Sequence, residues 1–297
     1  MGHIHSHEHS GTSDLKIAFY LNLFFTVIEI FGGLYTNSLA ILSDAVHDLG
    51  DSMSLGMAWY LENYAQKGED KRYSYGYQRY SLLSALVNTV ILTVGSLFII
   101  SQAIPRLINP EPTDAQGMVI FAILGIIVNG IAVLRLRGGK TLNARVVALH
   151  LIEDVLGWVA VLVLSVVLLF TNYYILDPIL SILITLYILY NVFKNMRVTL
   201  SLFLQAVPED VDLESIEDKL LQIDNICSTH HTHVWSMDGQ HHVLTTHLVV
   251  EEDTTREQIQ CIKEEVNQLS GELDFFHTTV EIEYGDERCS MTPAPPG

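Results

Sequence analysis

The chain has 297 residues, of which 49% are apolar and 17% charged, and its mean hydropathy is +0.30. Soluble domains carry roughly 25% charged residues, and the apolar residues here are concentrated between Leu15 and Leu204. This composition, with only three cysteines, excludes a fully soluble protein, a disordered chain and a disulfide-rich secreted protein. A net charge of −18 argues against nucleic acid as a partner and fits a cationic ligand.

Six apolar segments are long enough to cross a bilayer, which needs about 20 mostly apolar residues per helix. They are residues 15–35, 39–60, 82–104, 117–134, 146–170 and 174–192. The first is not a cleavable signal peptide, because the residues before it are acidic and histidine-rich and no small-residue cleavage pattern follows. The sequence therefore predicts an α-helical membrane domain over residues 15–204, preceded by a flexible, histidine-rich N-terminus over residues 1–14.

The basic residues predict the orientation in the membrane. An even number of spans puts both termini on one side, and cytoplasmic termini leave only Arg106 in the outer loops. The inner loops then hold Lys67, Lys71, Arg72, Arg79, Arg135, Arg137, Lys140 and Arg145. By the positive-inside rule, we expect both termini in the cytoplasm.

Two of the apolar segments each carry a histidine and an aspartate four residues apart. These pairs are His47 with Asp51 and His150 with Asp154. Residues i and i+4 share one face of a helix, so two such faces, if opposed, would bring two imidazoles and two carboxylates together. That ligand set suits tetrahedral Zn²⁺. The alternative is that these residues lock helices together, but two copies of the motif in different spans favour a metal site.

Other acidic residues in the same segments are weaker signals. Glu29 stands in the middle of the first span and could either steer protons or hydrogen-bond a neighbouring helix. Asp44 and Asp48 are expected near the metal-binding cavity or at its mouth.

Residues 205–290 have the pattern of a small soluble domain, followed by a flexible tail over residues 291–297. Apolar spacing and Pro208 predict a helix over residues 207–223, and β-prone runs around Asp238-Gly239 predict a hairpin. Residues 254–269 are amphipathic, with Thr254 or Thr255 as the N-cap, and residues 275–284 alternate as a strand. The order αββαβ predicts an α+β, ferredoxin-like domain.

This domain is rich in side chains that bind metals. They are His230, His231, His233, His241, His242, His247, Cys261, His277, Glu283, Asp286 and Cys289. We expect a site that includes His233 and His247, which would face each other across the hairpin. The alternative is that these are ordinary exposed histidines on strands.

These motifs resemble those of the cation diffusion facilitators, zinc transporters with six spans and a cytoplasmic domain. NSLAILSDAVHDLGDS is similar to the second-span signature of that family, ALHLIEDVLGWV to its fifth-span signature, and HTHVW to the first strand of its cytoplasmic domain. The resemblance implies a transport site of His47, Asp51, His150 and Asp154. It also implies metal binding by His233, His247, Cys261 and Glu283, with Zn²⁺ as the transported and the regulatory ion, and assembly as a homodimer.

Three features qualify the resemblance. His47 stands where some bacterial relatives have Asp, a change that goes with broader acceptance of Cd²⁺. Tyr73 and Tyr77 stand where some relatives have the histidines of an Asp-His-His loop site, so we expect that site to be missing. The loop RLRGGKTLNAR is short and lacks histidine, unlike eukaryotic vesicular members, which favours a bacterial plasma membrane.

The predicted site suggests how transport is driven. Zn²⁺ needs deprotonated ligands, and imidazole titrates near pH 6.5, so protons and metal compete for the same groups. We therefore expect export of Zn²⁺, with Cd²⁺ or Co²⁺ as further cargo, in exchange for protons. No phosphate-binding GxxxxGK[ST] motif is present, which disfavours an ATP-driven pump. An intramembrane metalloenzyme, which would need a general base that the motifs do not supply, and a metal sensor remain as alternatives.

Overall fold

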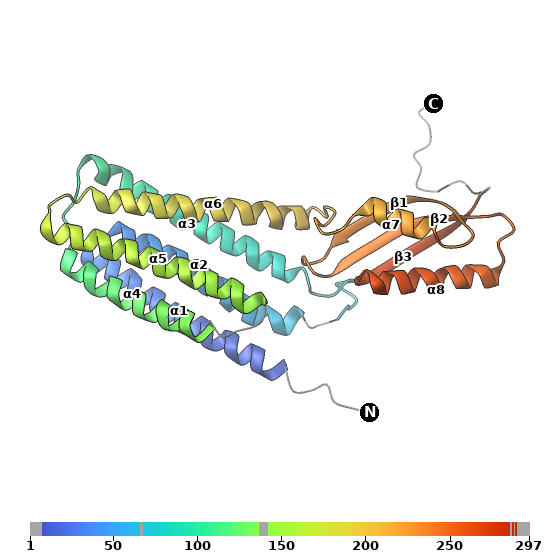
Figure 1. Ribbon diagram of the computed structural model, residues 1–297, viewed down its shortest axis with the longest axis horizontal. Helices are drawn as coiled ribbons and strands as arrows, with labels where there is room; N and C mark the ends of the chain where they lie inside the picture. Colours follow the sequence, from blue (N-terminus) through green and yellow to red (C-terminus); the bar gives the residue numbers. More distant parts are fainter. Residues whose placement is uncertain (1–7, 66–67, 137–141, 286, 288, 290–297) are drawn as a thin grey trace. The chain divides into compact units, whose positions relative to one another are not determined.

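The computed structural model describes residues 8–65, 68–136, 142–285, 287 and 289. Within these ranges it does not describe the side chains of residues 8–15, 17–18, 58–59, 61–65, 135–136 and 142–150. The fold divides into two compact units (Figure 1). The first comprises Met1–Gly68 and Leu83–Met196, and the second comprises Glu69–Leu82 and Arg197–Gly297.

Six long helices make up most of the first unit. They are α1 (Glu8–Thr36), α2 (Leu39–Ala65), α3 (Tyr80–Ile108), α4 (Ala115–Leu136), α5 (Leu142–Phe170) and α6 (Leu176–Phe203). The shortest has 22 residues, which at 1.5 Å per residue is about 33 Å, enough to cross a hydrocarbon core of about 30 Å. Over the described residues, five of them are apolar enough to span a membrane, and α2 differs because it carries Asp44, Asp48 and Asp51. The predicted six-helix membrane domain is confirmed.

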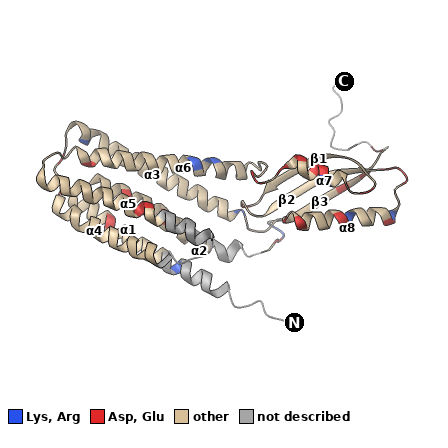
Figure 2. Cartoon of the chain, viewed as in Figure 1, with Lys and Arg blue, Asp and Glu red and all other residues tan. Residues whose placement is uncertain are grey.

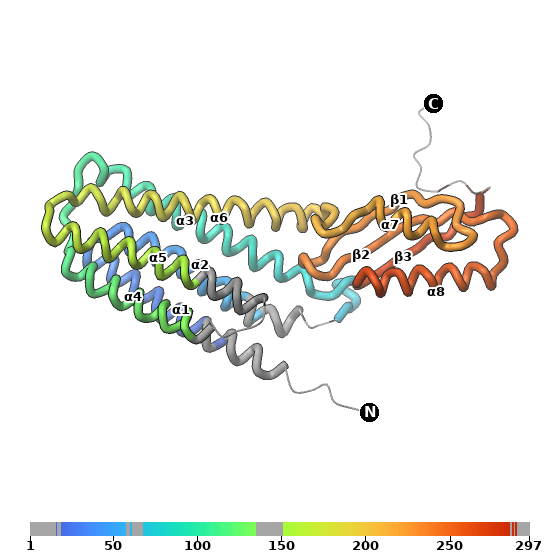
Figure 3. Tube along the Cα trace, viewed as in Figure 1, coloured from blue at the N-terminus to red at the C-terminus, as the bar shows by residue number. Residues whose placement is uncertain are grey.

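Helix α2 is central to this unit. It packs along α1 and also contacts α5. On α3, Leu92 fills the space beside Gly50, where an added Cβ would lie only 2.4 Å from the Leu92 side chain. On α6, Thr185 shares a hydrogen bond of 2.8 Å with Ser43. Figure 3 shows the Cα trace of these helices, coloured by residue number.

The outer faces of the helices are apolar, as expected for contact with lipid. Leu21, Phe24 and Phe31 on α1 are exposed, as is Phe170 at the end of α5. Figure 2 shows that charged residues are sparse along the described parts of the long helices and frequent on α7 and α8. Inside, the indole of Trp158 fills the space beside Gly125, where any side chain would collide with it.

The second unit contains α7 (Leu213–Leu221), β1 (Ile226–Ser236), β2 (His242–Val250), α8 (Arg256–Glu272) and β3 (Phe275–Tyr284). The sheet order is β1-β2-β3, with β1 antiparallel and β3 parallel to β2. Leu220, Leu244, Leu248 and Ile262 are buried in its own hydrophobic core. The predicted αββαβ order is confirmed.

Local signals explain where these elements begin. Thr255 and Gln258 form a reciprocal capping box at the start of α8. Helix α7 begins later than predicted, because the Asp212 side chain accepts a hydrogen bond from the Ser215 N–H and caps it. Gly239, with a φ of +98°, makes the turn after β1.

Candidate metal sites

Three of the four predicted transport ligands come together between α2 and α5. The Nε2 atom of His47 lies 3.8 Å from Asp51 Oδ2, one turn along α2, and 3.7 Å from Asp154 Oδ1 on α5. The His47 and Asp51 side chains are 24% and 27% exposed, whereas that of Asp154 is 8% exposed. The fourth predicted ligand, His150, lies on α5 but its side chain is outside the described residues.

This arrangement fits a small divalent cation. Tetrahedral Zn²⁺ with bonds of about 2.0–2.1 Å keeps its ligand atoms roughly 3.3 Å apart. The distances from His47 to the two carboxylates exceed that by only about 0.4–0.5 Å. His150 precedes Asp154 by four residues in the same helix, so the α5 backbone carries it on the same helical face.

Polar contacts hold α2 at its start and in its middle. Asp177 of α6 accepts hydrogen bonds from the Ser38 hydroxyl (2.6 Å) and from the Leu39 N–H (2.8 Å), and so caps the start of α2. Further along, the Asn22 side-chain amide of α1 donates to the Asp48 carbonyl and the Ser52 hydroxyl, each at 3.0 Å. These contacts fix the helix that carries His47 and Asp51.

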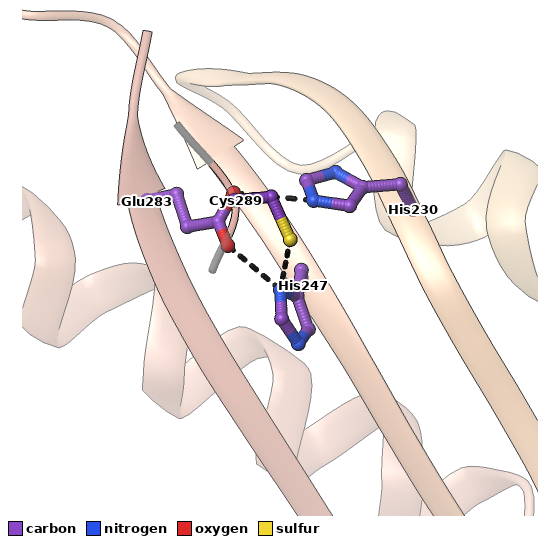
Figure 4. A group of neighbouring side chains, drawn as sticks. All are labelled: His230, His247, Glu283 and Cys289. Atoms are coloured by element: carbon purple, nitrogen blue, oxygen red, sulfur yellow. Dashed lines mark hydrogen bonds and ion pairs between the residues drawn. The ribbon is translucent and has the colours of Figure 1, made fainter. Parts of the chain in front are cut away.

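A second group of ligand-type side chains lies in the C-terminal unit (Figure 4). His230, His247, Glu283 and Cys289 present nitrogen, oxygen and sulfur atoms that all lie within 4.8 Å of one another. Glu283 is 2.7 Å from His247 Nδ1 and 3.1 Å from His230 Nε2, and Cys289 Sγ is 3.6 Å from His247 Nδ1. Imidazole, carboxylate and thiolate groups all bind Zn²⁺ in proteins.

The electrostatics of this cluster favour a charged carboxylate. Burial opposes ionisation of Glu283, but hydrogen bonds from His247 and Cys289 and the nearby charge of His230 outweigh it and lower the pKa of that carboxyl. Glu281, the strand partner of His247, adds a second carboxylate 3.4 Å from His247 Nε2. The negative charge of these carboxylates therefore favours binding of a cation by the cluster.

The structure brings together only half of the residues predicted for this domain. His247 and Glu283 are in the cluster, whereas His233 pairs with Thr245 and Cys261 is exposed on α8. The expectation that His233 faces His247 is wrong, because the register that starts at the hairpin turn pairs His233 with Thr245, and a bulge between His230 and His233 then pairs His247 with His230.

The position of the hairpin turn in the sequence predicts most of the observed pairing between β1 and β2. Counting back from the Asp238-Gly239 turn pairs Ser236 with His242 and brings His247 opposite the His230–His231 region. The bulge that selects His230 has His231 at a φ of +51°, which no pattern in the sequence reveals. Cys289 lies beyond β3, and only tertiary folding brings it back to the sheet.

The loop before α3 contains the stretch where a further metal site was expected to be missing. The Asp70 carboxylate accepts hydrogen bonds from the Tyr73 N–H (2.8 Å), the Tyr77 hydroxyl (2.8 Å) and the Arg72 N–H (2.7 Å). These bonds, led by that from the Tyr73 N–H, lower the pKa of Asp70. The Tyr77 hydroxyl thus donates to the Asp70 carboxylate, which would be a ligand if the metal site were present.

Comparisons with known proteins agree with this architecture. Residues 15–204 match the family model for the cation efflux transmembrane domain, and residues 208–284 match that for the cation efflux protein cytoplasmic domain. The chain belongs to the cation diffusion facilitator family. It is therefore a multi-pass membrane transporter for cations, not an enzyme.

Several relatives of this transporter are similar over nearly its whole length. It is 32% identical over 287 residues to the metal cation efflux system protein CzcD of Cupriavidus metallidurans, covering 95% of this chain and 90% of the relative. It is 33% identical over 303 residues to the zinc transporter ZitB of Pectobacterium atrosepticum, covering 98% and 92%. It is 32% identical over 290 residues to a cadmium, cobalt and zinc/H(+)-K(+) antiporter of Bacillus subtilis, covering 95% and 92%.

Proposed function

We propose that this transporter exports Zn²⁺, with Cd²⁺ and Co²⁺ as further cargo, from the cytoplasm in exchange for protons. The observation that carries the proposal is the convergence of His47, Asp51 and Asp154 between two membrane helices. Relatives named as a zinc transporter and as a cadmium, cobalt and zinc antiporter support the choice of cargo. His150 completes the proposed ligand set.

The chemistry of the ligands explains the exchange. A divalent cation binds the neutral form of His47 and the ionised forms of Asp51 and Asp154, so its binding releases protons from the site. Protons that return to these groups weaken the binding of the cation. If the site opens alternately to each side of the membrane, a proton gradient drives export of the cation.

The experiment that tests this proposal is Zn²⁺ uptake into proteoliposomes with an imposed pH gradient. Replacing Asp51 or Asp154 by Ala removes a ligand, and we expect uptake to fall to the background of empty vesicles with folding retained. Glu153→Gln is the matched control, because Glu153 is exposed one position from Asp154. Normal uptake by either alanine variant would refute the assignment of the site.

We further propose that both termini are cytoplasmic in a bacterial plasma membrane and that the chain forms a homodimer. The excess of basic residues in the inner loops supports the orientation, and the match of residues 208–284 to the family's cytoplasmic domain supports the placement of that unit. Labelling of a single cysteine, introduced into a chain whose three native cysteines are replaced, tests the orientation when it is done on intact and on lysed spheroplasts. A cysteine at residue 292 that reacts with an impermeant reagent from outside would reverse it.

We also propose that His230, His247, Glu283 and Cys289 bind a regulatory Zn²⁺ in the cytoplasmic unit. Their nitrogen, oxygen and sulfur atoms fit such an ion, which when bound would add positive charge to the sheet. Titration of zinc by calorimetry tests this. His230→Ala should lower the zinc bound per chain, whereas His233→Ala should leave it unchanged, and the opposite result would restore His233 to the site.

A further inference from the structure

Glu29, in the middle of α1, is a buried acid that the proposed transport site does not use. Its side chain is 1% exposed, and neither of its carboxyl oxygens has a hydrogen-bond donor among the described residues. Ionisable residues at such positions in membrane proteins usually have a function. Among the described residues, no N–H or hydroxyl group of a neighbouring helix donates to Glu29.

Among the described residues, the charged groups that act on Glu29 are all carboxyl groups. On α2, Asp48 lies within hydrogen-bonding reach of Glu29 and Asp44 acts on it through its charge, as does Asp154 on α5. Helix α4 also packs against α1 but has no titratable side chain between Ala115 and Leu134. Within the described residues, no basic side chain is among the groups that act on Glu29.

These surroundings determine the charge on Glu29. An ionised carboxylate buried without a donor or a basic partner is strongly disfavoured, and here it would also face carboxyl groups of like charge. Two carboxyl groups within hydrogen-bonding reach can attract each other only if one of them holds a proton. Glu29 is the more deeply buried of the two, at 1% exposure against 4% for Asp48, so we assign the proton to Glu29.

We propose that Glu29 is a proton-binding residue of the exchange reaction, separate from the ligands of the transported ion. Its carboxyl group is protonated while the transport site is empty. When a divalent cation binds at the site, the O–H bond of Glu29 breaks and the proton leaves to the water on the side to which the site is open. The inference rests on the proposed function, because it requires the cation to bind at that site.

Asp154 links Glu29 to the proposed transport site. Its carboxylate lies 3.7 Å from His47 Nε2 and is also among the charges that act on Glu29. A divalent cation bound beside Asp154 neutralises part of the negative charge that keeps Glu29 protonated. Because such coupling is reciprocal, protonation of Glu29 weakens binding of the cation to the same extent.

The test counts protons released per Zn²⁺ bound by the full-length protein in a weakly buffered detergent solution near neutral pH. All variants carry His247→Ala and Cys289→Ser, so that zinc binding by the cytoplasmic unit does not contribute. Glu29→Gln keeps the shape of the side chain but cannot ionise, and Glu153→Gln removes an exposed carboxyl group from α5 as the matched control. We expect Glu29→Gln to release up to about one proton fewer per ion than the control.

The outcomes are distinct. Equal proton release from Glu29→Gln and Glu153→Gln, with zinc bound by both, would overturn the role of Glu29. If Asp51→Ala binds Zn²⁺ as well as the parent, the proposed transport site itself is wrong, whatever the proton count. Glu29→Asp, which keeps an ionisable group, should restore the release.

A second measurement needs no variant at residue 29 and so does not depend on how Glu29→Gln folds. We expect the infrared difference spectrum on Zn²⁺ addition to show loss of the carbonyl stretch of a protonated carboxylic acid. A spectrum without that loss would equally overturn the proposal.

Discussion

At the scale of single residues, we expect the ligand atom at position 47 to set the preference for the transported ion. His47 presents an imidazole nitrogen to the two carboxylates of the proposed site. Nitrogen ligands suit Zn²⁺, whereas an added carboxylate makes a site harder and more negatively charged. We therefore expect the selectivity of the transporter to depend on this side chain.

This dependence gives a prediction about His47→Asp. The exchange of a nitrogen for an oxygen ligand should raise the ratio of Cd²⁺ to Zn²⁺ transported, with part of the activity retained. Parallel flux measurements with the two ions in proteoliposomes check it. An unchanged ratio would mean that His47 does not contact the ion.

A second residue-scale prediction concerns pH and the hairpin turn. Burial of Asp238 opposes ionisation, but hydrogen bonds from the N–H groups of His241 and Gln240 and from the His241 ring outweigh it and lower its pKa. A carboxyl group with a lowered pKa stabilises the fold above its unfolded pKa of about 3.9. That stabilisation is lost as the pH falls through the lower, folded value.

Asp238→Asn should therefore destabilise the cytoplasmic unit by about 0.5–1 kcal/mol at neutral pH, because solvent screens part of the interaction. The difference from the parent should shrink as the pH falls below about 3.9. Denaturant unfolding of residues 206–297, a unit with its own core, measures both values. A difference that stays constant with pH would contradict the assigned role of the carboxylate.

At the scale of elements, the membrane helices are easy to predict from the sequence, whereas the pairing of the strands is hard to predict. Helices that cross a membrane need long apolar runs, and the i,i+4 spacing of His47 and Asp51 determines that they share a face. The pairing of His247 with His230 instead depends on a bulge at His231. The backbone conformation of His231 thus determines which histidines are paired across the two strands, and neither composition nor periodicity predicts that conformation.

The cap at the start of α2 gives a prediction at this scale. Asp177→Ala leaves the buried donors of Ser38 and Leu39 unsatisfied, which should lower the free energy of unfolding by about 1–3 kcal/mol. Asp114→Ala is the matched control, because Asp114 caps α4 at an exposed position and accepts from the Gln116 N–H. Asp114→Ala should lower the free energy of unfolding by no more than about 1 kcal/mol.

Thermal unfolding in detergent compares the two variants, and Asp177→Asn, which keeps one acceptor oxygen, should fall between Asp177→Ala and the parent. Equal melting temperatures for Asp177→Ala and Asp114→Ala would show that the Asp177 cap adds nothing beyond an ordinary exposed cap.

At the scale of the whole molecule, we expect the cytoplasmic unit to hold two copies of the chain together. Analytical ultracentrifugation in detergent should find a dimer for the full chain and a larger monomer fraction for a chain that ends at residue 204. A full-length chain that sediments as a monomer at every concentration would contradict the dimer.

The central claim for the whole molecule is that one site, built on α2 and α5, exchanges a divalent cation for protons. The most direct test is Zn²⁺ flux in oriented proteoliposomes in which the pH on each face is set independently. Lowering the pH on the cytoplasmic face from about 7.5 to about 5.5 crosses the reference imidazole pKa of about 6.5 and should slow Zn²⁺ export steeply. Acidifying only the opposite face should speed export. A flux that ignores the direction of the proton gradient would contradict zinc–proton exchange.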